Sequence, residues 1–153
     1  MIRILIVCFL LISTAGFSQN FIGNSRTQVL KKLNDYIQKN DTLNAAVNDL
    51  DTAIILKVKG VPSLPVDFIY KFNKAGKCIS EKTIAYCDSC YHKYLNAALG
   101  NKKYGWKKIN GNQYVSNYAS QMLIELPVNE LDFSFVILKT AWSRDMYKML
   151  KGQ

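Results

Sequence analysis

Residues 86–93 constrain the fold of this chain most, because they join a strand pattern to a helix pattern near its middle. An apolar, strand-like run leads into them. After them, apolar residues recur at helical spacing over 91–99, and Gly100 is a typical residue to end a helix. Cys87 and Cys90 lie between the two patterns. The stretch therefore divides the chain into two parts and supplies the helix that begins the second.

The first part also begins with a helix. Ser25-x-x-Gln28 is a capping box, and an apolar stripe follows it, so we expect a helix over residues 25–39. Strand patterns follow each of the two helices, and residues 41–50 fit either a short helix or a loop. A short helix is expected over 142–150, with Trp142, Met146, Met149 and Leu150 on its apolar side.

This order of elements predicts an α+β fold. Each unit is a helix followed by a meander of strands, and the strands do not alternate with helices as they do around a parallel sheet. We therefore expect one antiparallel sheet, built from two helix-plus-meander units with the helices on one face, and a short C-terminal helix.

The first residues have the order of a secretory signal peptide. Arg3 precedes an unbroken apolar run over 4–12, and Gly16 and Ser18 occupy the −3 and −1 positions of a cleavage site. We therefore expect residues 1–18 to be a signal peptide and 19–153 a single domain, exported to the periplasm or beyond the cell. No later stretch is long and apolar enough to predict a transmembrane segment.

The chain is basic, with a formal net charge of +9, which favours anionic partners. No acidic residue occurs between Asp88 and Glu125. That interval holds a set of lysines and an indole that we call the basic-aromatic rim: Lys93, Lys102, Lys103, Trp106, Lys107 and Lys108. Lysines beside rings bind anionic polymers, and export favours envelope polymers over nucleic acid as the ligand. The alternative is that Trp106 belongs to the core and the lysines to a solvated face.

Three cysteines follow the expected signal peptide, and an exported protein is expected to form a disulfide. Three cysteines allow three pairings, and the hairpin around residues 73–76 favours one of them. It places Ile79, Thr83, Ala85 and Cys87 on the buried face and Cys78 on the other face. A regular strand would keep Cys78 too far from Cys87 for a disulfide, which favours a Cys87–Cys90 bond and a free Cys78.

The Cys-x-x-Cys pair also permits a catalytic interpretation. With Asp88 or Ser89 capping the second helix, its N-terminus would stabilise a Cys87 thiolate, and Cys90 would be the resolving thiol. The negative charge of Asp88 opposes that thiolate, so a structural disulfide is the favoured interpretation. The single histidine, His92, is not placed for haem attachment and is poorly placed to join the cysteines around a metal ion. We expect no metal and no cofactor.

The sequence thus leaves three functional hypotheses. The first is a small non-enzymatic binding module, for anionic envelope components or a protein partner, that uses a sheet or the basic-aromatic rim. The second is a thiol–disulfide oxidoreductase that uses Cys87 and Cys90. The third is a protein inhibitor that acts through an exposed sheet.

Overall fold

The structure is a computed structural model, and it describes residues 20–60, 63–129 and 132–152. The expected signal peptide lies outside the described residues. The elements run in the order α1 (Arg26–Lys39), β1 (Ala45–Leu50), β2 (Ala53–Val58), β3 (Val66–Phe72), β4 (Cys78–Ala85), α2 (Asp88–Leu99), β5 (Lys107–Lys108), β6 (Gln113–Val115), β7 (Met122–Glu125), β8 (Ser134–Lys139) and α3 (Arg144–Lys151).

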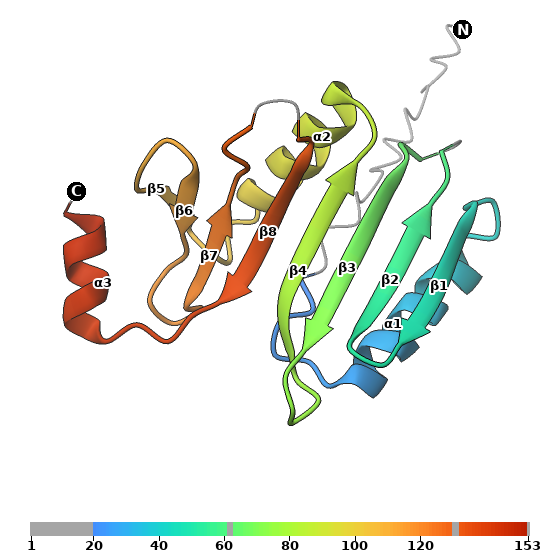
Figure 1. The fold of residues 1–153 in the computed structure, drawn as a ribbon, viewed down its shortest axis with the longest axis horizontal. Coiled ribbons are helices and arrows are strands. Elements are labelled where there is room, and N and C mark those ends of the chain that lie inside the picture. The colour runs from blue at the N-terminus through green and yellow to red at the C-terminus, as the bar shows by residue number, and fades with distance from the viewer. Residues whose placement is uncertain (1–19, 61–62, 130–131, 153) are drawn as a thin grey trace, which may run out of the picture.

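The strands form one eight-stranded sheet with the order β1-β2-β3-β4-β8-β7-β6-β5, and every pairing is antiparallel. Each meander keeps its sequence order within the sheet, and the two meanders join where β4 pairs with β8. Figure 1 shows α1 and α2 behind the sheet and α3 at its β5 end. The expected α+β fold, with its two helix-plus-meander units and short C-terminal helix, is confirmed.

Each of the first two helices covers the strands of its own unit. Val29 and Leu33 of α1 are fully buried in a cluster with residues of β2 and β3. Leu95 of α2 belongs to a second cluster with residues of β7 and β8. Tyr94 lies against both clusters. The core is therefore two adjoining clusters on one face of the sheet, and the opposite face has neither helix on it.

Local hydrogen bonds explain where the helices begin. The predicted capping box is confirmed: the Gln28 amide donates to Ser25 Oγ at 3.3 Å, and the Ser25 amide donates to Gln28 Oε1 at 2.9 Å. At α2, the residue that caps the helix is Cys87, and the prediction of Asp88 or Ser89 was wrong. The sulfur of Cys87 takes the capping role because it accepts the amide N–H of Cys90 at 3.1 Å.

Two details of the first unit differ from the sequence prediction. Residues 45–50 form the edge strand β1, neither a short helix nor a loop. A β-bulge between Lys71 and Phe72 shifts the register of β3 and β4, so that Phe72 lies opposite Cys78. Cys78 is therefore 1% exposed on the covered face, whereas Ile79, predicted to be buried, is 40% exposed.

The C-terminal helix packs through a different residue from those predicted. Met146 and Met149 are exposed, and Tyr147 is the buried residue of α3. Its ring contacts Tyr118 and Trp142, and its hydroxyl donates to the Ser116 carbonyl at 2.9 Å. One tyrosine therefore attaches this helix to the loop after β6.

Candidate functional site

The sheet face opposite α1 and α2, which we call the open face, is unusually rich in aliphatic residues. One row across it runs from Ile55 through Ile69 and Lys82 to Val136 and Glu125. A solvated antiparallel face ordinarily carries polar residues at such positions. The open face is defined here by the side chains that share this side of β2, β3, β4, β8 and β7: Ala53, Ile55, Lys57, Asp67, Ile69, Lys71, Ser80, Lys82, Ile84, Leu123, Glu125, Ser134, Val136 and Leu138.

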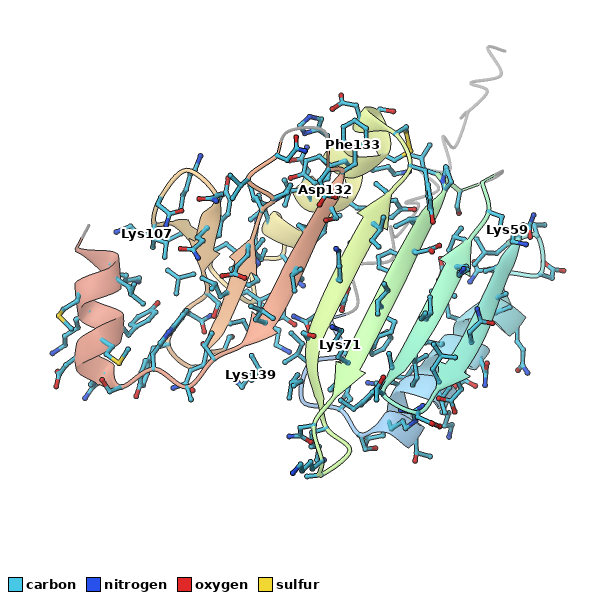
Figure 2. The ribbon with its side chains drawn as sticks, in the orientation of Figure 1. Lys59, Lys71, Lys107, Asp132, Phe133 and Lys139 are labelled. Atoms are coloured by element: carbon cyan, nitrogen blue, oxygen red, sulfur yellow. A yellow bond between two sulfur atoms is a disulfide. The ribbon has the colours of Figure 1, made fainter. Side chains whose placement is uncertain are left out.

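Lysines outnumber carboxylates on the open face. Lys57, Lys71 and Lys82 form no ion pair with the described residues. The two carboxylates have hydrogen-bond donors beside them: Tyr86 donates to Asp67 at 3.0 Å, and the Gln113 amide donates to Glu125 at 3.1 Å. Figure 2 shows this face toward the viewer, with Lys71 labelled on it. The face therefore combines aliphatic rows with three lysines that form no ion pair within the described residues.

The basic-aromatic rim is distributed over several elements. Lys93 lies on α2, Lys102 and Lys103 follow that helix, and Lys107 and Lys108 form β5. The register of β5 on β6 puts its two lysines on opposite faces of the sheet. The ammonium groups of Lys103 and Lys108 lie 5.6 Å and 5.8 Å from the ring centres of Tyr104 and Tyr114, and Lys107 donates to the Lys151 carbonyl. These lysines do not share one face.

Trp106 is not exposed as a stacking platform. Its indole N–H donates to the Ala98 carbonyl of α2 at 3.0 Å, and its ring lies 5.7 Å from that of Tyr104. The side chain is half-buried against the core cluster of the second unit. Trp106 therefore connects the segment after α2 to that helix. This position agrees with the alternative interpretation of the rim, in which Trp106 belongs to the core.

Cys87 and Cys90 form a disulfide and Cys78 is free, as the sequence favoured, whereas the burial of Cys78 was not predicted. Burial and the neighbouring Glu81 raise the pKa of the Cys78 thiol to about 12. Cys90 is buried, whereas Cys87 is half-buried at the start of α2 with Ser89 Oγ 3.3 Å from its sulfur. The sulfur closer to solvent is thus the one at the helix N-terminus.

A recess opens on the covered face, where the two units meet. Its empty space, open solvent at the mouth included, is about 380 Å³, and the recess has room for roughly one water molecule. The sheet supplies one wall, and α2 with residues 101–106 supplies the other. The side chains that matter for its chemistry are Phe68, Glu81, Thr83, Tyr94, Tyr104 and Trp106. We call this space the Glu81 recess.

Glu81 is the least expected of these side chains, because a fully buried carboxyl is rare without a cation beside it. It is 6% exposed, and its Oε2 atom has no hydrogen-bond partner among the described residues. Burial raises the pKa of this carboxyl to about 8, and a hydrogen bond with the backbone of Phe21 opposes that rise. The Thr83 hydroxyl, two positions along β4, is also buried without a partner in the described chain.

The sequence prediction missed Glu81, although the signal was present. Thr83 and Ala85 were placed on the buried face, and strict alternation extends that row back to Glu81. A charged residue in a buried row was the feature to follow.

No helix among the described residues is long and apolar enough to cross a membrane. Within the same part of the chain, no three His, Cys, Asp or Glu side chains lie close enough together to hold a metal ion. Comparisons of the chain with protein families, characterised proteins and solved structures found no match. The functional argument therefore depends on the open face, the disulfide and the Glu81 recess.

Proposed function

We propose that the protein is a non-enzymatic binding module whose open face contacts the surface of an acidic protein. The observation that carries the proposal is the row of aliphatic side chains interrupted by Lys82. Protein interfaces combine a central apolar area with a polar border, and complementary charge gives specificity and speeds association. The unpaired lysines of the open face favour carboxylates on the partner.

The aliphatic rows favour a protein over an anionic polymer. A polysaccharide or polyphosphate would be held by the lysines alone and would leave side chains such as Ile69 and Val136 in contact with water. With the expected export, the partner would be a protein of the periplasm or the extracellular space. A protein inhibitor is one form of this function, in which the partner is an enzyme.

The test uses the soluble envelope fraction of the source cell. The immobilised protein captures its partner, which is identified, purified and titrated back against the protein. Ile69→Glu should raise the Kd at least about tenfold, because it places a carboxylate in the centre of the interface. Met149→Glu is the matched control, because Met149 is exposed on α3, which lies at the β5 end of the sheet and is not part of the open face.

The charges are tested separately. Replacing Lys71 and Lys82 with Gln should weaken binding and reduce its dependence on salt, whereas Lys74→Gln in the β3–β4 turn should not. Capture of a polysaccharide, lost when Lys102, Lys103, Lys107 and Lys108 are neutralised and unaffected by Ile69→Glu, would contradict the proposal. That result would favour anionic-polymer binding through the rim.

A second candidate, thiol–disulfide exchange, is favoured by the position of Cys87 as the cap of α2. The amide of Cys90 already donates to its sulfur, and the helix N-terminus would stabilise a thiolate there. A substrate thiolate would attack Cys87, release the Cys90 thiolate and form a mixed disulfide. A second substrate thiolate would then attack the substrate sulfur of the mixed disulfide and release the Cys87 thiolate. The products would be the reduced protein and a substrate disulfide.

Equilibration in glutathione buffers, followed by alkylation and mass spectrometry, tests the exchange. A reduction potential between about −270 and about −120 mV would support it, because oxidoreductases of this kind function in that range. A bond that stays oxidised below about −300 mV would be a structural one, and the exchange would be rejected.

A further inference from the structure

The Glu81 recess lies on the face of the sheet opposite the open face, so its chemistry is independent of the binding proposed above. We propose that it is a binding site for a primary alkylammonium group, with the Glu81 carboxylate as counter-ion. Such a group occurs on amines, on diamines and at the end of a lysine side chain.

Two buried oxygen atoms of the recess can accept hydrogen bonds. Glu81 Oε2 and Thr83 Oγ1 are buried, face the same side of β4 and lack a hydrogen-bond partner among the described residues. Leaving such atoms unpaired costs about 1 to 3 kcal/mol each. A ligand that donates hydrogen bonds to both would remove this cost. An ammonium group has three N–H donors and no acceptor, which matches two vacant oxygens.

The walls favour a cation over a neutral donor. The rings of Phe68, Tyr94, Tyr104 and Trp106 line the recess. The faces of aromatic rings carry negative electrostatic potential, and a desolvated cation beside them gains about 2 kcal/mol. The salt bridges of the described chain lie elsewhere, between Arg26 and Asp49 and between His92 and Asp88. The recess thus has the composition of a cation site, and the described residues place no cation in an ion pair with Glu81.

Size selects the kind of cation. The recess has room for roughly one water molecule, and an ammonium group is of similar size. A quaternary ammonium group carries four carbon atoms around its nitrogen and has no N–H for Thr83. The alkyl stem of a primary amine would extend past the ring side chains that line the recess toward solvent.

Protonation links binding to pH. The free carboxyl has a pKa of about 8 and is therefore largely neutral at pH 7, and an ammonium ligand would bind its ionised form. Tyr70, Cys78, Tyr94 and Tyr104 surround Glu81, and their raised pKa values keep them neutral below pH 8. Affinity should therefore rise about 50-fold between pH 6 and 8, since the ionised fraction rises from about one in a hundred to one half.

The experiment is an NMR titration of the protein with n-butylamine at pH 8. Butan-1-ol and tetramethylammonium are the comparison probes. Saturable shifts are expected for the amides of Thr83 and Tyr104, which line the recess, with n-butylamine binding at least about tenfold more tightly than either comparison probe.

Two variants make the test specific. Glu81→Gln keeps the shape of the side chain and should weaken n-butylamine binding by about tenfold or more, and Glu125→Gln on the open face should leave it unchanged. Retained spectral dispersion shows that Glu81→Gln is folded. Binding that survives Glu81→Gln, equal binding of butan-1-ol, or the absence of saturable shifts would overturn the proposal and leave the recess as a site for water.

Discussion

Glu81→Gln should remove most of the pH dependence of stability between pH 5 and pH 8. In the unfolded chain the carboxyl has its ordinary pKa of 4.5, whereas in the folded protein burial raises that pKa to about 8. Between these values the folded state holds a proton that the unfolded state has released. The contribution of Glu81 protonation to the free energy of unfolding is therefore complete below the pKa of the unfolded chain. It is lost as pH rises through the pKa of the folded protein.

The magnitude follows from the two pKa values. At 1.36 kcal/mol for each pH unit, the interval from 4.5 to about 8 corresponds to about 5 kcal/mol. That is a large part of the 5 to 15 kcal/mol by which a typical domain is stable. A glutamine does not titrate, although its amide can leave buried N–H groups unpaired and so lower stability by about 1 to 3 kcal/mol at every pH. The difference between the two proteins should thus change with pH by a few kcal/mol in favour of the variant.

Urea denaturation at pH 5, 6, 7 and 8, followed by circular dichroism, measures this difference. Wild type and Glu81→Gln are compared at each pH, and Glu125→Gln serves as the control because that carboxyl is half-buried on the open face. A free-energy difference between wild type and Glu81→Gln that stays constant from pH 5 to 8 would refute the argument. Such a result would mean that the Glu81 carboxyl is ionised in the folded protein throughout the range.

Three further predictions concern the packing. Ser25→Ala removes the N-cap of α1 and should lower the free energy of unfolding by about 1 kcal/mol, measured by urea denaturation. Tyr147→Phe deletes the hydrogen bond to the Ser116 carbonyl and should cost about 1 to 2 kcal/mol in the same assay, without loss of the fold. Cys78, buried and with a pKa of about 12, should resist iodoacetamide at pH 8 in the native protein and react in urea.

Features with a local cause could be predicted from the sequence. The capping box needs two side chains three residues apart, and both of its hydrogen bonds form. In the strand β3, large apolar residues recur at every second position as Val66, Phe68 and Tyr70, a period typical of strands, and all three are buried. The disulfide and the free cysteine were also predicted correctly, although the register used for that argument was wrong at Cys78.

Features that depend on distant parts of the chain could not be predicted. The bulge between Lys71 and Phe72 inserts one residue into the pairing and leaves no periodic signal. The residues of the edge strand β1 are partly or fully exposed, so its sequence has no buried row that would indicate a strand. Its conformation is set by its pairing with β2. The Glu81 recess forms where two units meet, and no pattern within either unit describes that junction.

The way the two units join explains why the chain has both an open face and a recess. Each helix is positioned by the strands of its own meander, so α1 and α2 cover separate parts of one face and leave the other face bare. Between the two clusters, β4 carries Glu81 and Thr83 where a continuous core would have aliphatic residues. A chain selected for stability alone would gain by replacing such unpaired polar groups with apolar ones. The presence of these groups at a junction with an opening to solvent therefore favours a role in binding for the recess, in addition to the role that we propose for the open face.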